Sequence, residues 1–574
     1  MKCSKYSSSK ASKSCLGLLA ALSLGLFSTV AIAQTEGGEG SPPPVPPSLQ
    51  HDISTPSDYG PQHDNSNPSD LGPSSPDRGS GDRNLQSTID SGNPAEIITQ
   101  VEVSQSTEYA NHFGFNLYGE NASAETIANT LQQLASKTGV KAALIYVVET
   151  PKGLGLTLVL PSGSVQTSSS QVIPQNLKLA ANPFAANQFA ASPFAANPSA
   201  TNLLRTNPFN LVALIASLRP NLQLAQQTSP PTGNSNLAYR LIPDATPSAV
   251  KRVVRNFRRE LSDPTKVARN NYQAPAKTLY DWIIAPLKPA LEANNIETIV
   301  FSLDRGFRSV PVAALFDGQK FLVEQYNLAL IPSFSLTDTR YQRLQESKML
   351  GMGISQATGG QTPLPSVAVE VPTLTSKIWG GTGYLDQQST IAQFQALTQQ
   401  ERFGIIHLAT HALFNPGKVE QSYIQFWNER LTLPQLREIS LNQKWTSAPN
   451  IELLVLSACQ SALGNDQAEL GFTGLAVQSG VKTAVGSLWS VSDEGTLGLM
   501  SEFYRGLKTA PVRAAALRQA QLGLLQGQVK VVDGQLQLKD GTLVPLPAAA
   551  AQQKNVSFTH PYYWSAFTMI GNWN

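Results

Sequence analysis

Short apolar runs alternate with segments of helical periodicity from residue 236 to the end of the chain. The runs lie at 298–303, 403–408, 451–457 and 483–488. Continuous apolar runs of this length, bounded by turn residues, predict strands that are buried on both faces of a sheet. Because helical segments separate the runs, we expect an α/β fold in which helices flank a mostly parallel sheet.

The same region carries signals for helices and turns. Apolar residues recur at helical spacing over 250–261, where five Lys and Arg residues decorate the same segment. A solvated helix face is the usual explanation of such a charge run, and a basic docking face is the alternative. Another helix is predicted to begin at Ser492, and Asp533-Gly534 between two alternating segments predicts a β-hairpin.

Residues 96–165 have the pattern of a small α/β domain that precedes this region. Apolar residues within 98–103 predict a short strand, and a stripe that begins after Ser123 predicts a helix. Apolar runs at 142–148 and 154–160 predict two further strands. We find no candidate chemistry in this domain, and its role stays open.

Two other stretches lack periodicity. Residues 34–95 consist mainly of Pro, Ser, Gly, Asp and Asn, and they cannot bury enough apolar surface to fold, so we expect a disordered linker. Residues 166–235 contain four copies of a five-residue repeat of AANPF type. A stacked repeat is the alternative there, but three of the copies contain proline, which favours a low-complexity linker.

The first 33 residues have the order of a secretory signal peptide. Four lysines precede an apolar run at 16–30, and Ala31-Ile32-Ala33 follows as a cleavage site. An uncleaved anchor helix is the alternative, but the run is only moderately apolar. We therefore expect an exported protein, periplasmic or extracellular, with no stable membrane anchor after cleavage. Removal of 1–33 takes the formal net charge from +2 to −2, which does not favour nucleic acid as a partner.

Signal cleavage would leave Cys459 as a lone cysteine, because Cys3 and Cys15 lie within the signal. A single free thiol in an exported protein requires a reason. The predicted strand at 403–408 continues to His411, and the predicted strand at 451–457 continues to Cys459. If these strands are parallel neighbours, their ends meet at one edge of the sheet. An imidazole beside a thiol gives a nucleophile for acyl transfer, and backbone N–H groups at strand ends can bind the oxyanion.

Each candidate also has a plainer interpretation. His407 and His411 could bind a metal from one face of a helix, but on a strand they lie about 13 Å apart, so we expect no metal and no cofactor. His407 is then a packed or hydrogen-bonded residue. Cys459 could be buried core, although the apolar run stops before it. Asp493 could line a pocket for a basic substrate side chain, or it could be an acid in the first turn of a helix, and the second interpretation is slightly favoured.

Several segments resemble the CHAT family, caspase-like proteins that are related to separases. The histidine segment HLATHA and the cysteine segment LSACQSALG are similar to the two catalytic motifs of that family. Other segments that fit the family, in the right order, lie at 307–315, 364–371, 470–475, 480–489 and 560–567. The resemblance covers 236–574 and does not extend to the residues before it.

The resemblance implies a caspase-type α/β fold with a Cys459/His411 dyad. It also implies an oxyanion hole formed by backbone N–H groups of Cys459 and Ala412, where relatives often have glycine in place of Ala412. Many family members carry helical repeats that recruit an activating partner. No 34-residue period is present in this sequence, so the identity of any activating partner stays unknown.

Together these features predict an exported, bacterial, caspase-like cysteine endopeptidase that acts on protein or peptide substrates. Cys459 would attack the peptide carbonyl and His411 would handle the proton. Two alternatives remain open. The chain could be a catalytically idle interaction or scaffold module with the same fold, or the acyl group could pass to an amine instead of water.

Overall fold

A computed structural model describes part of the chain, namely residues 85, 87–89, 91–113, 117–118, 121–163, 178–179, 236–414, 421–445, 451–457, 460–461, 480–552 and 554–574. The chain divides into two compact units, Met1–Ser74 and Ser75–Asn574, and all of the described residues belong to the second. The expected signal peptide, most of the two expected linkers and Cys459 lie outside the described residues.

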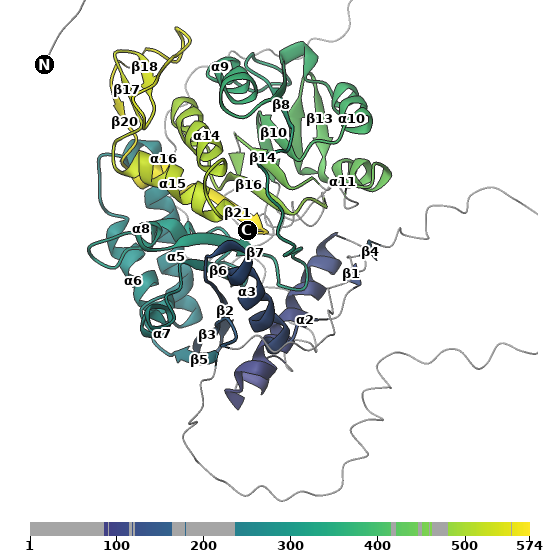
Figure 1. The fold of residues 1–574 in the computed structure, drawn as a ribbon. Coiled ribbons are helices and arrows are strands. Elements are labelled where there is room, and N and C mark those ends of the chain that lie inside the picture. The colour runs from purple at the N-terminus through teal and green to yellow at the C-terminus, as the bar shows by residue number, and fades with distance from the viewer. Residues whose placement is uncertain are drawn as a thin grey trace, which may run out of the picture. The chain divides into compact units, whose positions relative to one another are not determined.

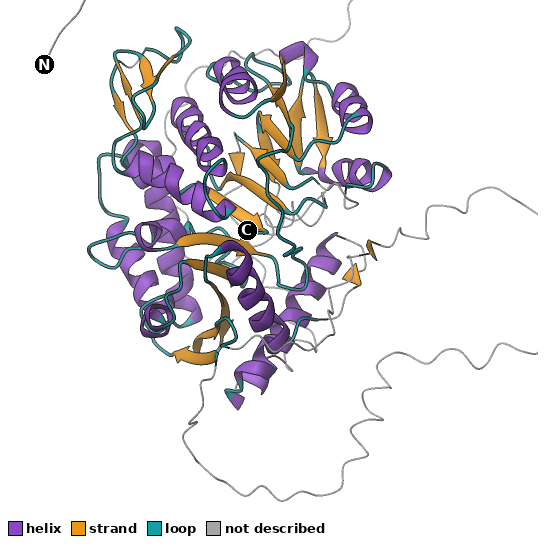
Figure 2. Cartoon of the chain, in the orientation of Figure 1, coloured by secondary structure: helices purple, strands orange, loops and turns teal. Residues whose placement is uncertain are grey.

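Within the described residues, one eleven-stranded sheet forms the centre of the fold, and helices cover it (Figures 1 and 2). The four predicted apolar strands are β6, β10, β14 and β16, and every residue in them is buried. The predicted α/β class, with a mostly parallel sheet flanked by helices, is therefore confirmed. In the order β5-β3-β2-β6-β7-β21-β16-β14-β10-β8-β9, the strands span Leu237–Ile242, Gly153–Val159, Ala142–Thr150, Thr298–Leu303, Asn327–Ile331, Phe567–Gly571, Thr483–Ser487, Leu453–Leu456, Ile405–Ala409, Met349–Gly353 and Gly381–Leu385.

The sheet has two halves of opposite direction. Strands β9, β8, β10, β14 and β16 are parallel to one another, and β21 pairs antiparallel to β16. Strands β2, β6 and β7 are also mutually parallel, and β7 runs parallel to β21. It follows that the carboxyl ends of β10, β14 and β16 lie at the opposite edge of the sheet from those of β2, β6 and β7.

The structure corrects the expectations for residues 96–165. Strands β2 and β3 do not form a sheet of their own, because β2 pairs in parallel with β6 and extends the central sheet. The strand predicted within 98–103 is wrong, because that segment belongs to helix α2 (Pro94–Phe113). Ile97, Ile98 and Val101 are buried at helical spacing. These β-branched residues favour a strand by their intrinsic preference, but the packing of α2 against the rest of the fold overrides that preference.

Helix α2 also buries a carboxylate, that of Glu102, near the carboxyl ends of β2 and β7. The Glu102 carboxylate accepts hydrogen bonds from Tyr146 Oη at 2.7 Å, from the backbone N–H of Phe334 at 2.8 Å and from Ser335 N at 2.7 Å. Burial raises the pKa of Glu102, and these donors oppose the rise. The polar residues of α2 thus tie the helix to β2 and to the segment after β7.

Helices cover both faces of the half of the sheet that contains β8, β10 and β14. Helices α9 (Val367–Pro372) and α14 (Asp493–Leu507) lie on one side of β8, β10 and β14, while α10 (Ile391–Gln400) and α11 (Leu433–Asn442) lie on the other (Figure 1). The helix predicted at Ser492 is α14, with the Ser492 hydroxyl accepting from Gly495 N. The remaining helices are α3 (Ala124–Thr138), α5 (Pro247–Ser262), α6 (Gln273–Ile283), α7 (Lys288–Ala293), α8 (Leu322–Gln325), α15 (Arg513–Leu525) and α16 (Pro561–Trp564).

Small sheets flank the central one. The predicted hairpin is formed by β17 (Lys530–Val532) and β18 (Gln535–Gln537), with Asp533 and Gly534 at positive φ. A second small sheet joins β11 (Ala412–Phe414), β12 (Tyr423–Phe426), β13 (Glu429–Thr432) and β15 (Gln460–Ser461). Strands β19 (Leu543–Pro545) and β20 (Val556–Ser557) pair with the two strands of the hairpin and complete its sheet. Strands β1 (Leu117–Tyr118) and β4 (Lys178–Leu179) form a separate two-stranded sheet.

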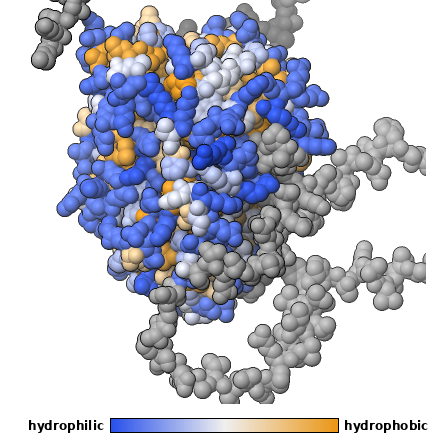
Figure 3. All heavy atoms as spheres, viewed as in Figure 1, coloured by the Kyte–Doolittle hydropathy of each residue, from blue (hydrophilic) through white to orange (hydrophobic). Residues whose placement is uncertain are grey.

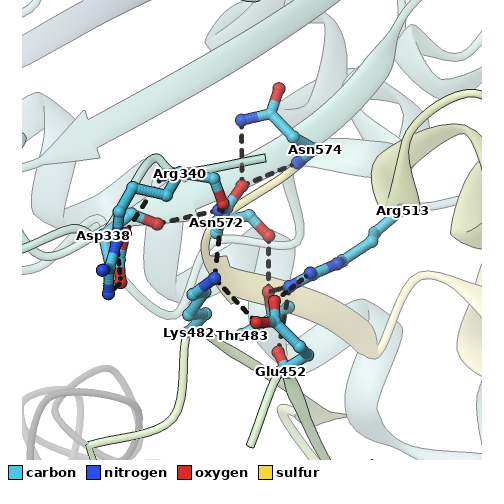
Figure 4. A network of polar contacts seen from close by, with 8 residues as sticks. All are labelled: Asp338, Arg340, Glu452, Lys482, Thr483, Arg513, Asn572 and Asn574. Atoms are coloured by element: carbon cyan, nitrogen blue, oxygen red, sulfur yellow. Dashed lines mark hydrogen bonds and ion pairs between the residues drawn. The ribbon is translucent and has the colours of Figure 1, made fainter. Parts of the chain in front are cut away.

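A buried polar network closes the edge of the sheet where β14 and β16 begin (Figure 4). Glu452 is fully buried, and its carboxylate pairs with Arg513 Nη2 at 2.5 Å and with Lys482 Nζ at 2.7 Å. Asn572 Nδ2 donates to the Asp338 carbonyl oxygen at 2.8 Å, in the segment that follows β7. The network therefore joins the two halves of the sheet.

The surface formed by the described residues exposes few large apolar side chains. On the face shown in Figure 3, hydrophilic residues dominate and apolar residues are scattered in separate groups. Among the described residues, the large apolar side chains that are exposed are Val103, Leu241 and Leu543. No helix in the described part of the chain combines the length and the apolar character needed to cross a membrane.

Candidate active site

The two strands that were predicted to carry the catalytic residues are parallel neighbours. In the pairing of β10 with β14, Leu408 stands opposite Leu456. Ser457 N donates to the Leu408 carbonyl oxygen at 2.9 Å, so the pairing continues to the last described residue after β14. The carboxyl ends of the two strands therefore meet at one edge of the sheet, as the sequence indicated.

His411 lies just beyond the end of β10, between that strand and β11. Its side chain is partly exposed, and its Nε2 lies 2.9 Å from the Thr362 carbonyl oxygen. A carbonyl oxygen can only accept, so this contact requires the proton of the neutral ring on Nε2. Nδ1 is then the ring atom that can accept a proton.

The Thr362 carbonyl belongs to the loop between β8 and α9, and polar side chains hold this loop in place. The Asp386 carboxylate accepts from Ser355 N at 2.7 Å and from Gln356 N at 3.1 Å. Further along the loop, the Thr358 hydroxyl donates to Asn428 Oδ1 at 2.7 Å and accepts from Asn428 N at 2.9 Å. These contacts hold the loop that orients His411, and they were not predicted from the sequence.

Cys459 lies outside the described residues, but the chain on each side of it is described. Ser457 follows β14, and β15 begins at Gln460. Strand β15 pairs in parallel with β11, and Gln460 stands opposite Leu413. The segment that follows Cys459 is therefore registered against the segment that follows His411.

Ala412, the other expected oxyanion-hole residue, is the first residue of β11. Gln425 N donates to the His411 carbonyl oxygen at 2.8 Å, and Ala412 stands opposite Ile424 in the antiparallel pair. Hydrogen-bonded and non-bonded pairs alternate along such a ladder, so the Ala412 N–H points away from β12. It points toward the side of β11 where β15 pairs.

A buried polar cluster lies beneath this edge of the sheet, and we call it the Glu370 cluster: Glu370, His407, Ser457 and Tyr504. His407 is fully buried, with Nε2 3.1 Å from Glu370 Oε1 and Nδ1 3.1 Å from Tyr504 Oη. The expectation that His407 is a packed, hydrogen-bonded residue is confirmed. The hydroxyl of Ser457 donates to the same Glu370 oxygen. Burial and the nearby Glu370 carboxylate raise the pKa of Tyr504.

Glu370, Ser457 and Tyr504 were not among the residues for which the sequence predicted a role. One signal for Glu370 was present, because it is a lone acid within the apolar run VAVEV at 367–371. An acid in such a run is buried only when it has a partner.

Asp493 is the first residue of α14 after the N-cap Ser492, which agrees with the plainer interpretation of this acid. Its Oδ2 accepts from the backbone N–H of Ser366 at 2.5 Å. Burial is the main cause that raises the pKa of Asp493 to about 7, and the Glu370 carboxylate adds to the rise. A carboxyl group that is bound to backbone and partly protonated at neutral pH is a poor receptor for a cationic side chain.

No group of three His, Cys, Asp or Glu side chains that could hold a metal ion is found among the described residues. The chemistry offered by the described part of this edge is an imidazole with a defined tautomer and a backbone N–H that faces β15.

The fold is an α/β fold in which helices flank a mostly parallel sheet, with a histidine just beyond the end of one central strand. A family model for the CHAT domain matches residues 273–572, and the chain belongs to this family. No curated protein sequence matches the chain significantly.

Two solved structures of Saccharomyces cerevisiae separase in complex with securin are similar to the chain. The first, at 2.6 Å resolution, has 9% sequence identity and a TM-score of 0.36 over 83% of this chain. The second, at 3.0 Å, has 11% identity and a TM-score of 0.36 over 84% of this chain. The matched region covers 33% and 34% of the separase chains, about a third of their length.

Proposed function

We propose that the chain is a caspase-like cysteine endopeptidase that uses Cys459 and His411 on protein or peptide substrates. The observation that carries the proposal is the register of β11 with β15, in which Leu413 stands opposite Gln460. Cys459 precedes Gln460 by one position in the sequence, and His411 precedes Leu413 by two. Each proposed catalytic residue is therefore within two positions of this pairing.

The proposed chemistry follows from the groups at this edge. His411, with its proton on Nε2 toward the Thr362 carbonyl, accepts the thiol proton of Cys459 at Nδ1. The thiolate attacks the peptide carbonyl carbon, and the backbone N–H groups of Ala412 and Cys459 donate to the oxyanion. Protonated His411 then donates to the leaving amine as the C–N bond breaks. Water hydrolyses the thioester, with His411 as the base, and restores the thiol.

Export is the second part of the proposal, and its support is the charged, apolar, small-residue order of residues 1–33. We propose cleavage after Ala33 and a periplasmic or extracellular location in a bacterium. N-terminal sequencing of the chain recovered from the periplasm or the culture medium tests this proposal, and Gln34 is expected as the first residue. An intact Met1 in that fraction would overturn cleavage.

The activity is tested on the purified chain from residue 34 to 574. A thiol-directed electrophile on a basic peptide, matched by one on a neutral peptide, is reacted with the wild type, Cys459→Ala and His411→Ala. Rapid labelling of the wild type that both substitutions abolish supports the dyad. Slow labelling that does not depend on His411 would reject it and favour the idle scaffold. Because the carboxyl group of Asp493 is bound to the backbone N–H of Ser366, we expect it not to select a basic side chain. The basic and the neutral peptide should therefore label Cys459 at equal rates.

The second step separates hydrolysis from acyl transfer. A cleavable peptide is supplied with and without a competing amine, and the products are identified by mass. Free acid as the sole product with the amine present supports the peptidase. An amide of the added amine as the main product would favour the acyl-transfer alternative.

A further inference from the structure

One oxygen of Glu370 connects the two strands that precede the proposed dyad. Glu370 Oε1 lies 3.1 Å from His407 Nε2 on β10, and it accepts a hydrogen bond from the Ser457 hydroxyl after β14. All three side chains are buried, Glu370 with 1% exposure and the other two with none. A buried acceptor shared by two strands holds their relative position more firmly than two separate exposed contacts would.

Helix α9 reaches these strands because glycines on β8 let it approach the sheet closely. A Cβ atom on Gly353 would lie 2.5 Å from Val367 Cγ1 and 2.8 Å from Val371 Cγ2. Both valines are on α9 and pack against Ala409 of β10. The close approach brings the Glu370 carboxylate to His407 and Ser457.

The two residues that Glu370 holds are near the proposed catalytic residues in sequence. His407 precedes His411 by four positions, and Ser457 precedes Cys459 by two. We propose that Glu370 is a positioning residue that fixes the carboxyl ends of β10 and β14 and so sets the geometry of Cys459 and His411. The catalytic half of this inference rests on the proposed function.

Four elements surround the carboxylate, and their polar groups define what a substitution changes. Glu370 comes from α9, His407 from β10, Ser457 from the end of β14, and α14 contributes Tyr504 together with Asp493. The second oxygen, Oε2, is buried and has no hydrogen-bond partner among the described residues. Glu370→Gln therefore retains the accepting oxygen for both strands, whereas Glu370→Ala removes it.

The experiment compares these two variants with a matched control, all at a temperature well below their melting points. The control is Glu452→Gln, because Glu452 is an equally buried carboxylate that precedes β14 at the opposite edge of the sheet. Two quantities are measured: the pH profile of the Cys459 alkylation rate, and amide hydrogen exchange of peptides covering 404–411 and 453–461.

Positioning predicts that Glu370→Ala slows alkylation about tenfold or more, since small displacements of a reacting pair cost large factors in rate. The same variant should accelerate exchange at both strand ends, where Ser457 N donates to Leu408. Glu370→Gln should recover most of both properties. Glu452→Gln, which acts at the amino ends of β14 and β16, should leave the alkylation rate unchanged.

The outcomes separate this inference from the proposed function. If Glu370→Ala keeps the wild-type exchange at both strand ends, or if Glu452→Gln has the same effect on alkylation, the positioning role is rejected. If wild-type alkylation does not depend on His411, the dyad is rejected. In that case the exchange data still decide whether Glu370 fixes the strand ends.

Discussion

At the scale of single residues, Asp493 makes the stability of the fold depend on pH. Its pKa rises from 3.8 to about 7 in the folded chain, mainly through burial. Between these values the folded chain retains a proton at Asp493 that the unfolded chain has lost, so the contribution of Asp493 to the free energy of unfolding should fall as pH rises from about 4 to about 7.

Asp493→Asn should remove this loss, because a neutral amide oxygen can still accept from Ser366 N. We expect the variant to exceed the wild type by about 4 kcal/mol at pH 8 and to match it below pH 4. Urea unfolding of both proteins at pH 4, 6 and 8 measures the difference. Wild-type and variant curves that stay parallel over this range would contradict the assignment.

At the scale of elements, the contact between α9 and β8 depends on the absence of side chains on the strand. Gly353→Ala places a Cβ 2.5 Å from Val367 Cγ1, so the helix must shift outward. We expect a loss of about 1–3 kcal/mol in the free energy of unfolding, as for other overpacked cores. Gly163→Ala is the control, because it is exposed and a Cβ there meets nothing within 4 Å. Equal urea midpoints for the two variants would rule out the close contact.

The network at the amino ends of β14 and β16 supports a second prediction at this scale. Burial lowers the pKa of Arg513, and the Glu452 carboxylate opposes that fall. Glu452→Gln leaves two cations buried beside a neutral amide, which should cost about 3 kcal/mol of stability. The control is Asp281→Asn in the exposed pair with Lys277, where we expect a loss well below 1 kcal/mol. A similar small loss in both variants, measured by urea unfolding, would show that the network is not a desolvated ion cluster.

At the scale of the whole molecule, local pattern predicted more of the fold than of the site. The four strands β6, β10, β14 and β16 were predictable because each is a short apolar run that needs no distant partner to be recognised. Their order in the sheet was not encoded in any single run. The helix at 94–113 was missed because its buried Glu102 is acceptable only once Tyr146 and Ser335 are beside it.

The candidate site divides in the same way. His411 could be placed at the end of a strand, since its position depends only on where an apolar run stops. The Thr362 carbonyl could not be assigned, because it is a backbone group that reaches His411 from 49 positions away through a loop held by Asp386. Glu370 similarly acquires a role only when α9 lies against the sheet.

The continuous sheet leads to a last prediction, about cooperativity. Residues 96–165 were expected to form their own domain, yet β2 pairs with β6, and β7 pairs with β21 at the centre of the sheet. The network of Figure 4 also links the ends of β14, β16 and β21 to the segment after β7. A body joined in this way should unfold as one unit.

Two matched substitutions test the prediction by calorimetry. Leu144→Ala removes a buried side chain from β2, and Ile406→Ala removes one from β10, in opposite halves of the sheet. Each should cost about 2–5 kcal/mol, and each should lower the melting temperature of the same single transition. If Leu144→Ala instead produced a separate transition at lower temperature and left the main one unchanged, the two halves would be independent domains. The loss of stability in one half would then not affect the other half. A shift of one transition by either variant requires that β21, which pairs with β16 on one side and with β7 on the other, transmit the loss.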